Sequence, residues 1–403
     1  MHIPSRSDGA ETSKPTRVDD SHMIIQETCT PGSLFSGDRF CVGYRIYGDE
    51  RQARAKADDI CIEQTVEFPA DEVPEGVIRD HVFGRVELFE PLDRDSFKAI
   101  VSFAVELAAG ELTQLLNVIF GNSSIKPGIR VEHLDLPGSL LKNFNGPRFG
   151  REGIRKLLNI PKRPLLSTAI KPMGLSCTEL ADLAYRFALG GMDMIKDDHG
   201  LTDQCCAPFE ERVRRCTEAV GRASRETGQP CLYIANVTAP HKEVVRRARF
   251  ARDAGAGGLM IAPGLVGYDL MRELAEDDSI ALPILTHPAL QGSFVTGPGG
   301  ISHGVLFGQL ARLAGADATI FPNFGGRFSF SREECRQIAL GTSAPMGHLK
   351  AIFPAPGGGM SLDKVPGMLE TYGQDLIFLI GGGLFKHGPD LVENCRHFRK
   401  MVE

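Results

Sequence analysis

The chain has 403 residues, of which 42% are hydrophobic and 24% are charged, and its formal net charge at pH 7 is -6. Such values are typical of a soluble globular protein, and the length predicts two domains. The composition lacks the basic excess of a nucleic-acid-binding protein, and no apolar run reaches the roughly 20 residues that span a bilayer. We therefore expect no nucleic-acid partner and no membrane association.

Residues 1–23 are rich in Ser, Asp, Arg and Pro, lack an apolar signal core, and are predicted to form a disordered tail. Ten cysteines without a regular spacing indicate reduced thiols and a cytoplasmic protein. Residues 24–145 predict an N-terminal α+β domain of the ferredoxin-like type. Its hydrophobic patterns predict strands over 40–47 and 82–89 and helices over 49–59 and 96–116.

The glycine- and proline-rich segment 144–150 marks a boundary, and residues 146–403 are predicted to form the second domain. Helices are expected over 177–189, 209–227, 242–254 and 303–313. Strands are expected over 165–171, 192–196, 231–236, 258–261, 283–287, 318–321, 349–353 and 376–380. Eight strands with intervening helices in about 250 residues predict a (β/α)8 TIM barrel. An open doubly wound sheet is the alternative, but its glycine-rich dinucleotide turn is absent after the first strand.

The segment from Gly190 to His199 is the most informative in the second domain. A short apolar strand runs directly into Lys196, Asp197, Asp198 and His199. Catalytic side chains of TIM barrels gather at the carboxyl ends of the strands. Carbon dioxide converts a lysine amine into an anionic carbamate, so this cluster could then hold a divalent cation. A charged strand-to-loop transition is the alternative interpretation of the motif alone.

Other strand ends also carry candidate functional residues. Lys171 ends the first barrel strand, where burial would lower its pKa toward a value useful for proton transfer. His287 ends the fifth strand, and Arg327 follows the sixth and could grip a carboxylate or phosphate with its guanidinium fork. Glycine runs follow the seventh and eighth strands, where barrels commonly bind phosphate, and Gly357, Gly358, Gly381 and Gly382 are the predicted phosphate ligands.

Together these motifs closely resemble those of RuBisCO large subunits and RuBisCO-like proteins (form IV), over nearly the whole chain from about residue 24. The resemblance implies that Lys171, Lys196 and His287 are catalytic. It further implies that Lys196, carbamylated, and Asp198 are ligands of one Mg²⁺ per site. His199 stands where the family has a glutamate ligand, so the metal could also differ or be absent.

The resemblance also implies a homodimer with shared active sites. Glu63, Thr65 and Asn117 look like the elements that RuBisCO dimers insert into the neighbouring barrel mouth, with Glu63 and Thr65 as substrate-binding residues and Asn117 as a catalytic one. Four residues that carboxylation needs are replaced here, by Met173, His199, Pro288 and Arg327. We therefore expect a RuBisCO-like protein that does not fix CO₂.

The expected activity is metal-assisted enolate chemistry on a phosphorylated sugar or sugar acid. The first choice is a decarboxylase, a carbon–carbon lyase of carbohydrate catabolism acting on a β-keto sugar acid phosphate such as 3-oxo-isoapionate 4-phosphate. Arg327 favours this choice because it suits a substrate that already carries a carboxylate. The alternatives are a transcarboxylase/hydrolase on the same substrate, an enolase or isomerase of a ketose 1-phosphate of the methylthioribulose type, and a non-catalytic sugar-phosphate binder.

Overall fold

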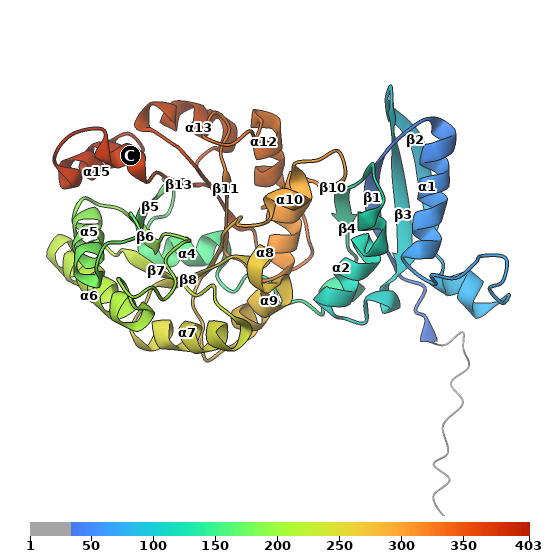
Figure 1. The fold of residues 1–403 in the computed structure, drawn as a ribbon, viewed down its shortest axis with the longest axis horizontal. Coiled ribbons are helices and arrows are strands. Elements are labelled where there is room, and N and C mark those ends of the chain that lie inside the picture. The colour runs from blue at the N-terminus through green and yellow to red at the C-terminus, as the bar shows by residue number, and fades with distance from the viewer. Residues whose placement is uncertain (1–33) are drawn as a thin grey trace, which may run out of the picture. The chain divides into compact units, whose positions relative to one another are not determined.

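The computed structural model describes residues 34–403, and the tail predicted over residues 1–23 lies outside this range (Figure 1). Residues 35–403 belong to one compact unit that contains a five-stranded sheet and an eight-stranded sheet. The domain boundary between residues 145 and 146 stays a prediction. Across residues 34–403, no helix combines the length and the apolar character that a membrane crossing needs.

The first sheet is formed by β1 (Arg39–Tyr47), β2 (Arg85–Asp93), β3 (Ser96–Ala104) and β4 (Ile129–Asp135) in the order β4-β1-β3-β2, with antiparallel pairs. The helices α1 (Glu50–Glu63) and α2 (Leu112–Phe120) lie between its strands in the chain, which is the ferredoxin-like arrangement that we expected. The short strand β10 (Gly300–Ile301) extends this sheet, parallel to β4.

The helix predicted over 96–116 is wrong for its first half. Residues 96–104 form β3, which pairs with β1 on one side and β2 on the other. Phe97 stacks on Phe89 of the neighbouring strand, with ring centroids 5.1 Å apart. Cross-strand pairing and burial on a central strand outweigh a local helical pattern. Helical structure begins only with the 3-10 turn Val105–Ala108 and continues in α2.

The second sheet is the predicted TIM barrel, with eight parallel strands in the order β12-β11-β9-β8-β7-β6-β5-β13. The strands are β5 (Leu165–Ile170), β6 (Met194–Asp197), β7 (Leu232–Asn236), β8 (Gly258–Ile261), β9 (Ile284–Thr286), β11 (Ala318–Pro322), β12 (Phe353–Gly357) and β13 (Ile377–Leu379). The principal helices are α5 (Cys177–Leu189), α6 (Phe209–Thr227), α7 (His241–Asp253), α9 (Tyr268–Glu276), η5 (Val305–Leu310), α12 (Arg332–Gly341), α13 (Val365–Tyr372) and α15 (Leu391–Lys400).

Other helical segments complete the connections between these elements. They are η2 (Ile78–Val82), η4 (Asn122–Ile125), α3 (Gly138–Leu141), α4 (Gly150–Leu158), α8 (Pro263–Val266), α10 (Gly292–Val295), α11 (Ala311–Leu313), η6 (Leu362–Lys364) and α14 (Gly382–Phe385). Three of the longer helices begin with a capping box, in which the first residue and the residue three positions later satisfy each other's backbone N–H groups. The pairs are Asp49 with Gln52, Ser176 with Glu179 and Ser331 with Glu334.

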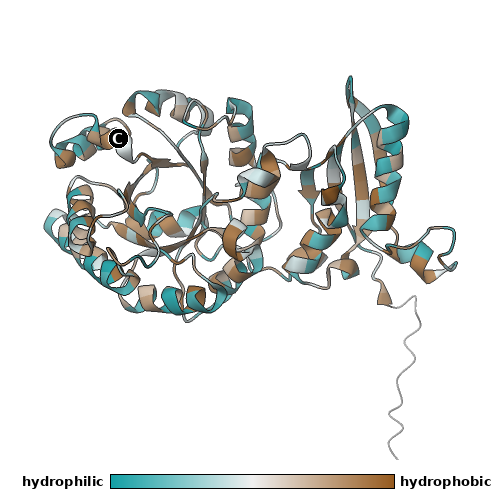
Figure 2. Cartoon of the chain, viewed as in Figure 1, coloured by the Kyte–Doolittle hydropathy of each residue, from teal (hydrophilic) through white to brown (hydrophobic). Residues whose placement is uncertain are grey.

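In strand β6 the side chains point alternately into the barrel interior and toward the surrounding helices. Successive residues of a strand point to opposite faces of the sheet. Met194 packs with other strand residues in the barrel interior, while Ile195 packs with the layer between strands and helices. In Figure 2 the barrel strands are mostly brown, and the surrounding helices carry both teal and brown. The same alternation decides where the charged residues after Ile195 point.

The seventh barrel strand lies four residues later than predicted, at 353–357 instead of 349–353. Pro354 and Pro356 lower the strand propensity of these residues, which is why the sequence pattern misplaced them. Their neighbour Phe353 donates its N–H to the carbonyl oxygen of Asp317, directly before β11, so the two prolines stand where N–H groups would face β13. Because proline has no N–H, β12 and β13 lie side by side without a ladder of hydrogen bonds between them.

A buried ion pair secures the opposite end of the barrel. Asp193 is 2% exposed and accepts two hydrogen bonds from Arg163, at 2.7 and 2.6 Å, and one from the backbone N–H of Leu166, at 2.8 Å. These bonds join the start of β6 to the start of β5. The fork geometry of the guanidinium makes the pair specific as well as strong.

Asp193→Ala should lower the free energy of unfolding by about 3 kcal/mol, because it leaves the mostly buried Arg163 without its anion. Asp58→Ala is the matched control, since it removes an ion pair to Arg54 in which both side chains are half exposed, and it should cost less than about 1 kcal/mol. Urea unfolding measures both changes. Equal losses in the two variants would show that the buried pair does not anchor the strands.

Candidate active site

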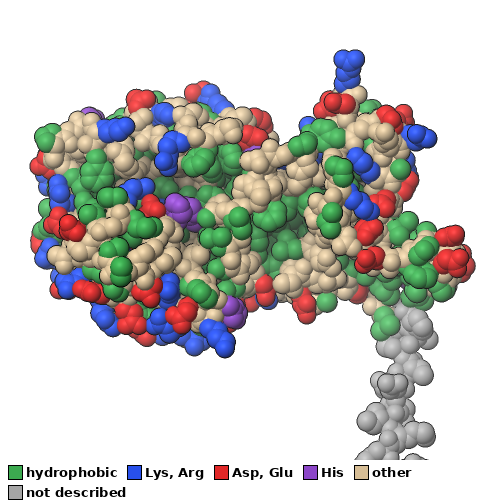
Figure 3. All heavy atoms as spheres, in the orientation of Figure 1, with side chains coloured by type: hydrophobic (Ala, Val, Ile, Leu, Met, Phe, Trp, Pro, Cys, Tyr) green, Lys and Arg blue, Asp and Glu red, His purple; other side chains and the backbone are tan. Residues whose placement is uncertain are grey.

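A cavity of about 1030 Å³ opens at the carboxyl ends of the barrel strands. All ten predicted site residues of the second domain line it: Lys171, Lys196, Asp198, His199, His287, Arg327, Gly357, Gly358, Gly381 and Gly382. Figure 3 shows the hollow in this face, with histidine atoms (purple) inside it. Residues from six different strand ends therefore meet in one place, as the barrel topology requires.

Asp198 is the centre of the charged part of the cavity. Its carboxylate lies 3.1 Å from Nζ of Lys171 and 3.1 Å from Nδ1 of His199. Burial by itself would raise the pKa of Asp198, but the hydrogen bond from His199 and the nearby Lys196 and Lys171 charges lower it well below the usual range. Asp198 is therefore an anion at every ordinary pH.

Lys196 is the most deeply buried of the site lysines, with 3% of its surface exposed. Its Nζ donates one hydrogen bond, of 3.0 Å, to the backbone carbonyl oxygen of Asp197. Burial lowers the pKa of Lys196 to about 8, helped by the charge of Lys171 and opposed by the charge of Asp198. A substantial fraction of the amine is thus neutral, and so nucleophilic, near physiological pH.

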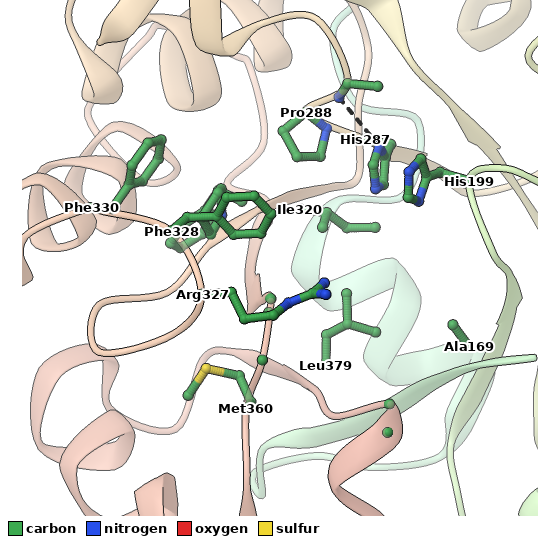
Figure 4. Close-up of a pocket in the computed structure, with 18 of the residues that line it drawn as sticks. Ala169, His199, His287, Pro288, Ile320, Arg327, Phe328, Phe330, Met360 and Leu379 are labelled. Atoms are coloured by element: carbon green, nitrogen blue, oxygen red, sulfur yellow. Dashed lines mark hydrogen bonds between the residues drawn. The ribbon is translucent and has the colours of Figure 1, made fainter. Parts of the chain in front are cut away.

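His287 is a neutral hydrogen-bond donor. Its Nδ1 lies 3.2 Å from the backbone N–H of Ala289, which donates to it, so the ring proton must reside on Nε2 (Figure 4). Burial, followed by the charges of Lys196 and His199, lowers the pKa of His287 to about 2. The His287 ring stacks on that of His199, with centroids 4.3 Å apart.

The first glycine turn, Gly357 to Gly359 at the end of β12, and the loop after β11 are joined by backbone hydrogen bonds. Asn323 and Arg327 donate their N–H groups to the carbonyl oxygens of Gly357 and Gly358, at 2.8 and 3.0 Å. A Cβ atom at Gly359 would lie 2.5 Å from Cγ of Arg327, so this contact requires glycine. The Arg327 side chain lies over the glycine turn and reaches into the cavity (Figure 4).

The far part of the cavity is apolar. Ile320 and Phe330 line it, together with Pro288, which stands after the strand-five histidine, whereas Phe328 packs on Gly358 beside Arg327. Figure 4 shows Phe328, Ile320 and Pro288 on the same side of Arg327. The cavity therefore has three parts: a cationic part with Arg327 and the glycine turns, a charged centre around Asp198, and an apolar part next to Pro288.

Glu63, Thr65 and Asn117 do not line this cavity. Thr65 donates its hydroxyl to the carbonyl oxygen of Cys61, at 2.7 Å, and the exposed Asn117 lies 3.4 Å from Gln114. Asn122, which the sequence analysis did not single out, donates its amide to Glu63 at 3.1 Å. It lies just beyond the end of α2, so its side chain is not part of the helix face that packs on the sheet.

Lys196, Asp198 and His199 fit a divalent cation only as a set that includes a carbamylated lysine. Without the carbamate, the described part of the chain has no group of three or more His, Cys, Asp or Glu side chains that could hold a metal ion. The neutral fraction of Lys196 is the form that reacts with CO₂. A carbamate would supply a second anionic oxygen ligand beside Asp198.

Comparison with known proteins places this geometry in a family. Residues 151–400 match the model of the ribulose bisphosphate carboxylase large chain, catalytic domain. The 5-methylthioribulose-1-phosphate isomerase of Rhodospirillum rubrum is 38% identical over 91% of this chain and 96% of its own length. The crystal structure of the Rubisco-like protein from Rhodopseudomonas palustris superposes with a TM-score of 0.82, at 37% identity, over 90% of this chain and 97% of that one.

The prediction of a decarboxylase is wrong. Besides the isomerase, a relative from Bacillus pumilus, 31% identical over 88% of this chain and 89% of its own length, is named 2,3-diketo-5-methylthiopentyl-1-phosphate enolase. These names favour the alternative of an enolase or isomerase. The position of Arg327 explains the error, because its backbone is bound to the first glycine turn and its side chain lies there too, so it does not indicate a separate carboxylate site.

Histidine-labelled protein should show His287 as the neutral Nε2–H tautomer from about pH 5 to about pH 9, because a lowered pKa means that the ring stays neutral above it. Long-range ¹H–¹⁵N NMR spectra distinguish the two ring nitrogens. A spectrum in which His287 gains a proton near pH 6 would contradict the assignment.

Proposed function

Because the chain belongs to the RuBisCO large-chain family as a RuBisCO-like protein, we propose that it is an enzyme that moves protons next to the carbonyl group of a ketose 1-phosphate. The proposed substrate class is a five-carbon keto sugar phosphate with a thioether at the far end, of the 5-methylthioribulose 1-phosphate type. Isomerisation is preferred to enolisation of a diketone, because the relative named as an isomerase is more similar than the one named as an enolase.

The observation that carries this proposal is the polarity of the cavity. The glycine turns and Arg327 offer backbone N–H groups and a guanidinium to one phosphate. The other part of the described lining, with Pro288, Ile320 and Phe330, has no Lys or Arg side chain for a second phosphate and suits an apolar tail. A bisphosphate would leave one dianion in this apolar surface, which is costly.

Lys171 is the proposed proton-transfer residue. Its Nζ forms an ion pair with Asp198. A Cβ atom at Gly381 would lie only 3.5 Å from the same Nζ, so the amine stands between Asp198 and the second glycine turn, which begins at Gly381. A substrate phosphate held at that turn would bring its neighbouring carbons close to Lys171. His287 then donates Nε2–H to the oxygen on which negative charge develops, and it needs no protonation change to do so.

The proposed metal is Mg²⁺, held by carbamylated Lys196 and by Asp198, with His199 as the third residue of the set. When bound, the cation would stabilise the negative charge of an enediolate oxygen. The chain's own contribution is to keep Lys196 buried and partly neutral, and to keep Asp198 ionised.

A homodimer with shared active sites is proposed as the assembly. Glu63 accepts hydrogen bonds from Asn122 and from Lys126, at 3.1 and 2.9 Å, outside the cavity of its own chain. Ile125 beside them is 83% exposed, which is unusual for a large apolar residue. The Glu63–Asn122 pair is the proposed part of the N-terminal domain that completes the partner's cavity.

The protein should catalyse exchange of solvent deuterium into the carbons flanking the carbonyl group of 5-methylthioribulose 1-phosphate. Lys196→Met should reduce this exchange about a thousandfold, the range of a lost general acid–base or charge-stabilising group. Lys162→Met, which changes an exposed lysine away from the cavity, is the control and should keep full activity. NMR of the sugar phosphate in D₂O measures both. Full exchange by the Lys196 variant, or none by the unaltered protein, would overturn the proposal.

Mixing inactive Glu63→Gln chains with inactive Lys196→Met chains should restore part of the activity, because a heterodimer then contains one intact shared site. Mixing Lys196→Met with Lys171→Met should restore nothing, since both changes lie in the barrel and no site is intact. Subunit exchange is verified by native mass spectrometry. Absence of recovery after verified exchange would rule out sites shared in this way.

A further inference from the structure

We propose that Arg212 and Asn236 are positioning residues that hold the segment from Asp198 to Ala207 at the end of β6, and thereby set the places of Asp198 and His199 in the active site. Neither side chain lines the cavity, and each acts through the backbone of this segment. The catalytic meaning of the inference rests on the proposed function, whereas the structural part can be tested without a substrate.

The inference begins with the direction of Asp197. Strand alternation sends Lys196 and Asp198 into the cavity, and Asp197, between them, to the helix side of the sheet. Asp197 is fully buried there. It accepts hydrogen bonds from the Tyr233 hydroxyl at 2.7 Å and from the Asn236 backbone N–H at 3.0 Å. A buried carboxylate persists only when it is paired and hydrogen-bonded.

Arg212 of α6 is the cation of this buried pair. It is 0% exposed, and its Nε lies 3.3 Å from Asp197. Its other two nitrogens donate to the carbonyl oxygens of Ala207 and Thr202, at 2.6 and 2.8 Å. One guanidinium fork therefore ties the second half of the segment to the end of β6, and a lysine could not make all three contacts.

Asn236 at the end of β7 holds the first half of the same segment. Its amide donates to the carbonyl oxygens of His199 and Leu201, at 3.0 and 2.9 Å. The side-chain oxygen Oδ1 of Asn236 accepts a hydrogen bond from the backbone N–H of Thr238, at 3.2 Å, and this bond fixes the orientation of the side-chain amide. The backbone of His199 is thus bound directly to the neighbouring strand.

Together these contacts explain how the ten-residue segment from Asp198 to Ala207 can present two site residues with fixed geometry. Loops of this kind are ordinarily mobile. Here four of its carbonyl oxygens accept hydrogen bonds from two buried side chains. Small errors in the placement of reacting groups cost large factors in rate. Loss of Arg212 should therefore slow the reaction without weakening phosphate binding, which the proposed function places at the glycine turns that follow β12 and β13.

The test compares Arg212→Met with Arg212→Lys and with the unaltered protein. Hydrogen–deuterium exchange should be about tenfold or more faster over residues 198–208 in Arg212→Met, because the segment loses two of its four side-chain hydrogen bonds. The kcat for proton exchange on 5-methylthioribulose 1-phosphate should fall about tenfold or more, with KM nearly unchanged. Arg212→Lys should recover part of both losses, because it retains the charge beside Asp197.

Arg312→Met is the matched control. Arg312 is also a buried arginine, and it binds the carbonyl oxygens of Ala344, Leu349 and Lys350, away from the cavity. Its loss should lower thermal stability but leave both kcat and the exchange of residues 198–208 as they are. If Arg212→Met does not fold, Tyr233→Phe removes one hydrogen bond to Asp197 and should produce smaller changes in the same direction.

Unchanged exchange over residues 198–208 in the folded Arg212 or Tyr233 variants would overturn the inference, whatever the activity. A rise in KM with unchanged kcat would also overturn it. If the unaltered protein does not act on the sugar phosphate but the exchange rates change as expected, the proposed function fails and the positioning of the segment stands.

Discussion

Side-chain alternation at the end of β6 is the constraint on which the active site depends. Lys196, Asp197 and Asp198 are consecutive and charged, yet they serve two different surfaces. The first and third enter the cavity, whereas Asp197 is buried behind it against Arg212 and Tyr233. A shift of one residue along the strand would exchange these roles and place an uncompensated charge in the helix layer. The buried ion pair therefore stabilises the register as well as the connection that follows.

The glycine turn after β12 shows a second use of the backbone. Its carbonyl oxygens bind the N–H groups of Asn323 and Arg327 from the loop after β11. Gly358 and Gly359 have φ values of +87° and +84°, a conformation that side chains disfavour. A turn whose carbonyl oxygens are used on one side leaves its N–H groups for an anion on the other. The loop after β11 and the glycine turn therefore form one hydrogen-bonded unit.

The charges of the cavity are arranged so that neighbouring groups hold different protonation states. Asp198 stays ionised, Lys196 is partly neutral near pH 8, and His287 is neutral because burial and the charge of Lys196 lower its pKa. Burial acts on all three groups, but it is offset only where an opposite charge lies close by. A site that supplies an anion, a neutral amine and a neutral donor within one cavity suits enolate chemistry, in which charge develops on a carbonyl oxygen.

The sequence by itself determined the barrel, the α+β class of the first domain and ten cavity residues, because strand periodicity and the position of polar residues at strand ends are local properties. It misplaced residues 96–104 and the seventh barrel strand, where pairing with neighbouring strands outweighs local pattern. Only the tertiary structure decided that Arg327 lies on a glycine turn, that Asn122 contacts Glu63, and that Asp197 and Arg212 form a buried pair. These are contacts between residues that are distant along the chain or lie on different elements, and their direction depends on how strands and helices pack, which no single segment specifies.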